Sequence, residues 1–211
     1  MSRRIVLLLA ITFPLVFSSI AQAGFGVGGN LLISLPQEDF ANVSETGGGL
    51  GLNFLYSPPM MPVIAIRVDV GLVAYGSEIY EDEVAGIPVD VKYSNQSAQV
   101  TIGPQFQMPT GPVRFYAAPM VGVYNYTNTV SIEGTDISET ESSTTNFGWN
   151  FSSGMLVRVY QSPIKKFNLD IDLSGKYHTI KDAIETEIED DVVIKTDAND
   201  ISIHAGVLFT F

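Results

Sequence analysis

The sequence predicts an all-β protein in which eight antiparallel strands close into an up-and-down transmembrane β-barrel. Three observations lead to this prediction. After residue 23, segments of about ten to fourteen residues alternate apolar and polar side chains, which is the period of a β-strand. The connections between these segments alternate between short and long. Of the 23 acidic residues, 19 fall in the four long connections, so the acid gathers at one end of the predicted barrel.

The first 23 residues have the features of a secretory signal peptide. Arg3 and Arg4 precede the apolar run Ile5 to Phe17, and Ala21-Gln22-Ala23 is a small-residue cleavage site. The run is too short for a membrane-spanning helix, which needs about 20 apolar residues. We expect cleavage after Ala23. Residues 24–211 then form one barrel domain, and the loss of two arginines changes the net charge from −12 to −14.

Composition excludes several kinds of protein. The 211 residues include no cysteine, so neither a disulfide framework nor a thiolate metal site can form. No later uncharged apolar stretch approaches the 18 residues of a membrane helix. If the mature protein enters a membrane, we expect it to do so as a barrel.

Four segments alternate clearly, namely residues 64–72, 146–159, 167–178 and 200–211. In the third, one face is apolar and the other is ionic. The apolar face carries Phe167, Leu169, Ile171, Leu173, Gly175 and Tyr177. The other face carries Asn168, Asp170, Asp172, Ser174, Lys176 and His178. Four weaker segments bring the total to an even eight: residues 25–35, 50–56, 98–106 and 113–126.

The connections fall into two classes by length. Short, turn-like connections cover residues 57–62, 108–112 and 161–166, and each contains proline. Long connections cover residues 36–47, 76–94, 127–144 and 179–199. Transmembrane barrels have short periplasmic turns and long extracellular loops, so this alternation favours a membrane barrel. The second and fourth long connections still alternate in part, so we expect them to project past the bilayer as paired strands.

A soluble ligand-binding barrel of the lipocalin type is the alternative, because it also has about eight alternating strands. Two features favour the membrane barrel. Aromatic residues on the apolar face lie near segment ends, as in interfacial girdles: Tyr56, Phe106, Phe115 and Phe167 by the short turns, and Tyr75, Phe147, Trp149 and Tyr177 toward the long loops. The continuous apolar face would aggregate in water. Heat-modifiable migration of detergent-extracted protein would distinguish the two.

The C-terminal stretch Ile201 to Phe211 resembles the assembly signal of bacterial outer-membrane barrels. Its apolar residues alternate, with Val207, Phe209 and Phe211 at the end. Residues 24–211 as a whole resemble the small eight-stranded families related to OmpA, OmpX and OmpW. The resemblance implies a monomer in the bacterial outer membrane with periplasmic N- and C-termini. It also implies recognition by the barrel assembly machinery and contact with outer-membrane lipid and lipopolysaccharide. Because the sequence ends at Phe211, we do not expect the peptidoglycan-binding domain of full OmpA proteins.

Charged residues on the inward face are the candidate site. Eight strands enclose an interior that side chains fill. An unpaired charge there would cost several kcal/mol, so we expect an ionic network that plugs the lumen. Its members are Arg67, Asp69, Arg114, Arg158, Asp170, Asp172 and Lys176, with Asp200 as a further candidate. The alternative is a narrow or gated conductance along this column, which silent bilayer recordings of folded protein would contradict.

The sequence gives little support for a catalytic or metal site. Ser202-x-His204 with Asp170 or Asp172 suggests a lipid-modifying esterase, but these residues point into the lumen, so we expect no enzyme activity. The two histidines, His178 and His204, are too few for a zinc site, and no cofactor or metal site is expected.

The long loops carry the remaining expectations. Their acidic runs, Glu81 to Glu83 and Glu187 to Asp191, could bind Ca²⁺ or Mg²⁺ weakly. Nucleic acid is not expected as a partner. We expect a structural or surface-interaction role for the barrel, with adhesion, envelope integrity and passage of small solutes as open alternatives.

Overall fold

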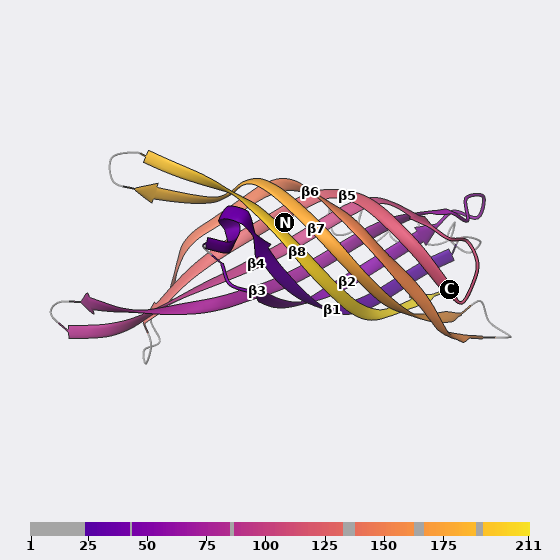
Figure 1. The fold of residues 1–211 in the computed structure, drawn as a ribbon, viewed down its shortest axis with the longest axis horizontal. Helices are drawn as coiled ribbons and strands as arrows, with labels where there is room; N and C mark the ends of the chain where they lie inside the picture. Colours follow the sequence, from indigo (N-terminus) through magenta and orange to yellow (C-terminus); the bar gives the residue numbers. More distant parts are fainter. Residues whose placement is uncertain (1–23, 43, 85–86, 133–137, 163–166, 189–191) are drawn as a thin grey trace, which may run out of the picture.

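The computed structural model of the chain describes residues 24–42, 44–84, 87–132, 138–162, 167–188 and 192–211. Within them, eight antiparallel strands form one closed barrel in sequence order, with β8 paired to β1 (Figure 1). The elements are β1 Gly24–Gln37, the 3-10 turn η2 Glu38–Asn42, β2 Gly47–Ser57, β3 Ile64–Val84, β4 Ile87–Gln107, β5 Val113–Ile132, β6 Ser138–Gln161, β7 Asn168–Ile188 and β8 Val192–Thr210. The predicted fold class is therefore confirmed. The described part of the chain contains no helix long and apolar enough to cross a membrane.

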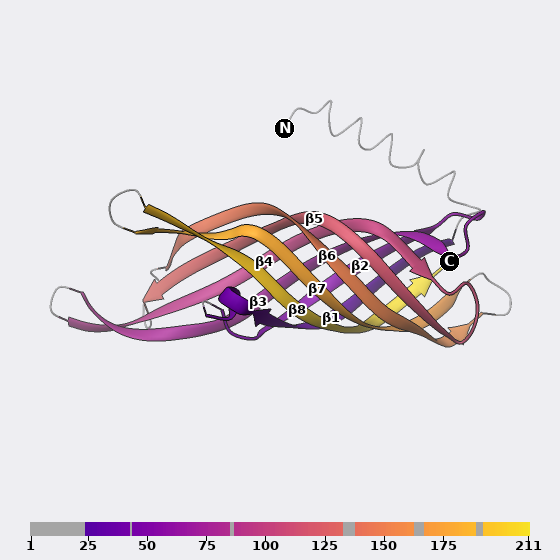
Figure 2. The ribbon, with the colours of Figure 1, turned by 45° about the horizontal axis from the view of Figure 1, so that its top comes forward.

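The eight strands lie where the alternation predicts them, but most extend further at the end of the long connections. The β3–β4 and β7–β8 hairpins project beyond the rest of the barrel (Figures 1 and 2). This confirms the paired strands expected in the second and fourth long connections. The prediction of a loop over the whole third long connection, residues 127–144, is wrong. Strand β5 continues to Ile132, and β6 already begins at Ser138.

The two faces of the barrel differ as the alternation predicts. Large apolar residues point outward, and Leu31, Phe115 and Phe147 are each more than half exposed. Inward positions carry buried polar and charged side chains, including Arg67, which is only 1% exposed. Every backbone group at membrane depth needs a partner inside the protein, and a closed sheet supplies it. The outward apolar face is therefore the face that a membrane-spanning barrel would present to lipid, and we call it the lipid-facing surface.

One aromatic residue departs from the expected outward girdle. Tyr75 is 6% exposed and packs inside the barrel, so its assignment to the outer face is wrong. The reason is strand parity, because Tyr75 lies on the same face of β3 as Arg67 and Asp69. By contrast, Phe147 and Trp149 are exposed on the outer face as expected.

Close strand packing depends on inward glycines at two neighbouring positions. A Cβ atom at Gly103 would collide with the backbone oxygen of Pro119, and one at Gly122 with that of Val100. These positions admit no side chain without moving backbone. The two glycines therefore allow β4 and β5 to approach each other closely at these positions.

The two ends of the barrel are unlike. Gly24 and Phe211 both lie at the end of the short connections, where the N–H of Phe25 donates to the carbonyl of Phe211 at 3.2 Å. At the opposite end, toward the long connections, η2 places Phe40 inside the barrel, and this side chain is fully buried. The first long connection is thus an ordered cap in its 3-10 part, which the sequence did not predict.

Candidate functional site

Four charged side chains form a central ion group in the lumen: Arg67, Asp69, Asp172 and Lys176. Arg67 Nε donates to Asp69 at 2.8 Å, and Lys176 Nζ donates to the same carboxylate at 2.6 Å. Arg67 Nη2 reaches Asp172 across the barrel at 3.3 Å. All four residues are at least 95% buried. The group carries two positive and two negative charges, so it is electrically balanced.

Neutral side chains complete the hydrogen bonding of the central ion group. Gln105 accepts from Arg67 Nη1 at 3.0 Å, and Tyr116 Oη donates to Asp172 at 2.7 Å. The guanidinium carbon of Arg67 also lies 5.1 Å from the centre of the Tyr116 ring, within the range of a cation–π contact. Charges removed from water are tolerated when they are paired and hydrogen-bonded in this way.

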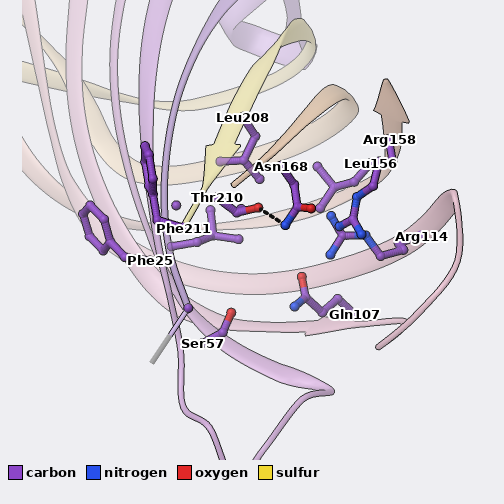
Figure 3. Close-up of a pocket in the computed structure, with 13 residues that line it drawn as sticks. Phe25, Ser57, Gln107, Arg114, Leu156, Arg158, Asn168, Leu208, Thr210 and Phe211 are labelled. Atoms are coloured by element: carbon purple, nitrogen blue, oxygen red, sulfur yellow. Dashed lines mark hydrogen bonds between the residues drawn. The ribbon is translucent and has the colours of Figure 1, made fainter. Parts of the chain in front are cut away.

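A second set, the mouth ion group, lies toward the short connections: Arg114, Asp170 and Arg158. Arg114 Nη2 donates to Asp170 at 2.6 Å, and Arg158 Nε donates to its other oxygen at 3.1 Å. Asp170 is fully buried, whereas the Arg158 side chain is 23% exposed. Two guanidinium groups therefore share one carboxylate beside a pocket at this end of the lumen (Figure 3).

A buried leucine cluster packs beside both ion groups. Leu55, Leu156 and Leu208 line the pocket at the mouth and belong to a buried cluster with Ala65 and Tyr116. Because Tyr116 itself contacts Asp172, this cluster lies against the central ion group on its other side. In the strand register Leu156 faces Asp172 and Leu208 faces Asp170, so apolar side chains flank members of both ion groups.

Beyond the central ion group, a chain of buried hydrogen bonds crosses the lumen. It links residues of five strands in the order Asn150, Tyr124, His178, Ser202, His204 and Asn30, with separations of 2.8–3.1 Å. The two ends set its direction, because the Asn150 amide nitrogen can only donate and the Asn30 amide oxygen can only accept.

With both imidazoles neutral, the direction of this chain sets their tautomers. His204 donates from Nδ1 to Asn30, so its Nε2 accepts from the Ser202 hydroxyl. Ser202 then accepts from Nε2 of His178, whose Nδ1 accepts from Tyr124. Both imidazoles are neutral in this arrangement. Ser202 is 2% exposed and forms hydrogen bonds with both histidines. Because it is buried in the lumen, a lipid substrate at the outer face does not reach it.

An aromatic cap closes the lumen toward the long loops. Phe40 packs edge-on against Tyr75 and Tyr126, with ring centres 5.4 and 5.7 Å apart. They belong to a buried cluster that also includes Leu32, Val73, Tyr124, Ile180 and Ala198. Asp200 lies near this level and accepts a hydrogen bond of 2.7 Å from Ser34.

All seven residues of the expected ionic network point into the lumen. The structure gathers them into two separate groups rather than one column, with Asp200 in neither. Sequence reasoning missed Gln105, Tyr124 and Phe40. The first two share the parity of the charged inward residues, which was an available signal. No period marks Phe40, because it lies in a 3-10 turn.

The residues of the expected assembly signal lie on the outer face of β8 and at its end. Val207, Phe209 and Phe211 are 38–56% exposed. Phe167 packs against both phenylalanines, with ring centres 6.0 and 5.5 Å apart. They form an aromatic cluster at the short-connection end of the lipid-facing surface. Recognition of these residues by the assembly machinery stays a prediction.

Comparison with known proteins agrees with this architecture. Two similar solved structures are Ail, the attachment invasion locus protein of Yersinia pestis, in complex with the heparin analogue sucrose octasulfate, and Neisserial surface protein A. Ail is 14% identical, with a TM-score of 0.56 over 90% of this chain and 99% of that chain. The Neisseria protein is 18% identical, with a TM-score of 0.50 over 89% of this chain and 97% of that chain. These likenesses concern the fold alone.

The comparison with curated proteins gave no match. Residues 5–209 match the family described as outer membrane protein beta-barrel domain. This match covers nearly the whole chain and decides between the two alternatives left by the sequence, a membrane barrel and a soluble lipocalin-like barrel. The chain belongs to the outer membrane protein beta-barrel family.

Proposed function

We propose that this protein is a plugged barrel of the bacterial outer membrane with a structural or surface-interaction role. The observation that supports it is the filled lumen, which holds the mouth ion group, the leucine cluster, the central ion group, the hydrogen-bond chain and the aromatic cap. Removing any one member of the balanced central ion group leaves an uncompensated buried charge, so the plug resists opening. Solute passage is then not the main role, and the extracellular hairpins carry the contacts.

Planar-bilayer recording tests the plug. Protein that shows heat-modifiable migration, and is therefore folded, should give no conductance steps in bilayers. Reproducible single-channel steps from the same preparation would contradict the plug and support the narrow conductance instead. The Phe40→Ala variant is a useful comparison in the same recordings, because it removes the central ring of the aromatic cap and leaves both ion groups intact.

Orientation is part of the proposal, with both termini in the periplasm and the long hairpins outside the cell. Its support is the alternation of short and long connections, together with the position of Gly24 and Phe211 at the short-connection end. The chain has no cysteine, so single cysteines are clean labels. In intact cells, an impermeant maleimide should label Lys181→Cys and leave Thr110→Cys unlabelled until the outer membrane is opened. The reverse pattern would contradict the orientation.

The surface partners we propose are cations and cation-bridged lipopolysaccharide rather than polyanions. The four long connections contain 19 acidic residues and three basic ones, Lys92, Lys181 and Lys195. Ail was solved with a sulfated heparin analogue, but acidic hairpins would repel such a ligand. We expect the thermal midpoint to rise with millimolar Ca²⁺ and to stay unchanged with Na⁺ at equal ionic strength. An unchanged thermal midpoint with Ca²⁺ would contradict the binding of divalent cations by the hairpins.

We infer that the barrel is not an enzyme, and that it is a monomer. Ser202 and His204 are buried inside the lumen, whereas lipid substrates reach only the outer face and the rims. Lipid A from cells expressing Ser202→Ala should match lipid A from cells expressing the unaltered chain. A changed lipid A profile would contradict the inference. Sedimentation in detergent should give the mass of one chain.

A further inference from the structure

We propose that the pocket beside the mouth ion group binds a small oxyanion with the size and chemistry of inorganic phosphate. The pocket has a volume of about 150 Å³ and opens among the strand ends at the short connections (Figure 3). A cavity of about 150 Å³ holds a ligand the size of benzene, so an oxyanion of five heavy atoms fits. This site adds a ligand to the mouth ion group of the plug, whose proposed function requires no ligand.

An excess of positive charge at the pocket wall is the first argument. Arg114 and Arg158 share the single carboxylate of Asp170, and their donors occupy both of its oxygens. The mouth ion group therefore carries a net charge of +1, whereas the central ion group is balanced. Two guanidinium groups held next to each other repel, and an anion between them removes that repulsion.

An unused donor is the second argument. Arg114 is 8% exposed, and its Nε has no hydrogen-bond partner among the described residues. A buried donor without a partner is costly, and a guanidinium presents its donors as a planar fork that fits an oxyanion. Figure 3 shows the head groups of Arg114 and Arg158 side by side at one wall of the pocket.

Neutral donors surround the same space. Gln107 accepts from Gln105 through Oε1, which leaves its amide nitrogen as a donor in the pocket lining. Thr210 accepts from Asn168 at 3.2 Å, so its hydroxyl hydrogen can be given to a ligand (Figure 3). Leu55, Leu156 and Leu208 also line the pocket, and apolar walls of low dielectric constant strengthen the attraction between the arginines and an anion.

The described pocket lining contains no Asp or Glu side chain. The backbone oxygen of Phe211 in this lining accepts a hydrogen bond from the N–H of Phe25. Among the described residues, Arg114 and Arg158 form their ion pairs with Asp170. The excess charge of the mouth ion group is therefore not neutralised by direct contact.

Titration of the folded full-length protein in a neutral detergent tests the site, with inorganic phosphate as the probe and chloride at matched ionic strength as the reference. The readouts are the arginine Nε–Hε signals in NMR spectra and the thermal midpoint. Phosphate should shift the Arg114 signal in a saturable way and raise the midpoint, whereas chloride should do neither. Arg158→Gln should weaken phosphate binding at least tenfold. Lys181→Gln, which removes an exposed charge at the opposite end, should leave it unchanged.

Three results would overturn the proposal: shifts that do not saturate, equal effects of chloride and phosphate, or equal phosphate affinity in Arg158→Gln and the unaltered chain. Heat-modifiable migration shows whether each variant is folded. If Arg158→Gln does not fold, Arg158→Lys keeps the charge and loses the forked donor. Its phosphate affinity should fall at least threefold, and an unchanged affinity also overturns the proposal.

Discussion

Neutralising Asp69 is the most direct test of the central ion group. Asp69 is 4% exposed and pairs with two cations, Arg67 at 2.8 Å and Lys176 at 2.6 Å. In Asp69→Asn the shape is kept, but the two cations are left with Asp172 alone. The group then carries a net charge of +1 inside a closed lumen. The side chain itself remains able to accept hydrogen bonds, so the change is chiefly one of charge.

The expected cost follows from two estimates that agree. Breaking a buried ion pair by removing one partner costs about 3–5 kcal/mol. One pair of unit charges 4 Å apart is worth about 4 kcal/mol at an effective dielectric constant of 20. We therefore expect Asp69→Asn to lower the free energy of unfolding by about 3–5 kcal/mol. Asp69→Asn combined with Lys176→Met restores charge balance and should be more stable than Asp69→Asn alone.

Equilibrium urea unfolding in phospholipid vesicles measures this free energy. Trp149 is the only tryptophan, and it is 48% exposed on the lipid-facing surface, so its fluorescence reports loss of the inserted barrel. Glu45→Gln is the matched control, because replacement of this exposed acid should change stability by no more than about 0.5 kcal/mol. A loss below about 1 kcal/mol in Asp69→Asn would refute a buried, charge-compensated lumen.

Three further predictions concern other parts of the barrel. Phe40→Ala removes the fully buried ring of the aromatic cap and should cost about 3–5 kcal/mol in the same urea assay; a loss within 0.5 kcal/mol of zero, about the size of a surface change, would contradict the packing. Gly103→Val should abolish heat-modifiable migration because its Cβ meets the backbone of β5, whereas Gly48→Val, with no atom within 4 Å, should fold. Phe211→Ala should slow membrane assembly in cells while leaving the urea midpoint of assembled protein nearly unchanged; normal assembly kinetics would remove the residue from the signal.

The sequence was sufficient for the parts of the fold that depend on period two. In a strand, alternate side chains face opposite sides, so parity alone assigns Arg67, Asp170 and Lys176 to one face. The contrast between short and long connections adds the up-and-down order. The same parity would have placed Tyr75 inside, and its assignment to the outer face ignored the period of its own strand.

Only the tertiary structure decided which charges meet. Arg158 and Asp170 face each other in the register of β6 and β7, but Arg67 on β3 reaches Asp172 on β7 across the lumen. Such a contact depends on the stagger of all eight strands around the closed barrel, which no local pattern encodes. The sharing of Asp170 by two arginines has the same origin, since Arg114 lies on β5 and Arg158 on β6. The sequence determined which side chains enter the lumen, and barrel closure determined their partners, because pairing is set by height and angle around the axis rather than by position along the chain.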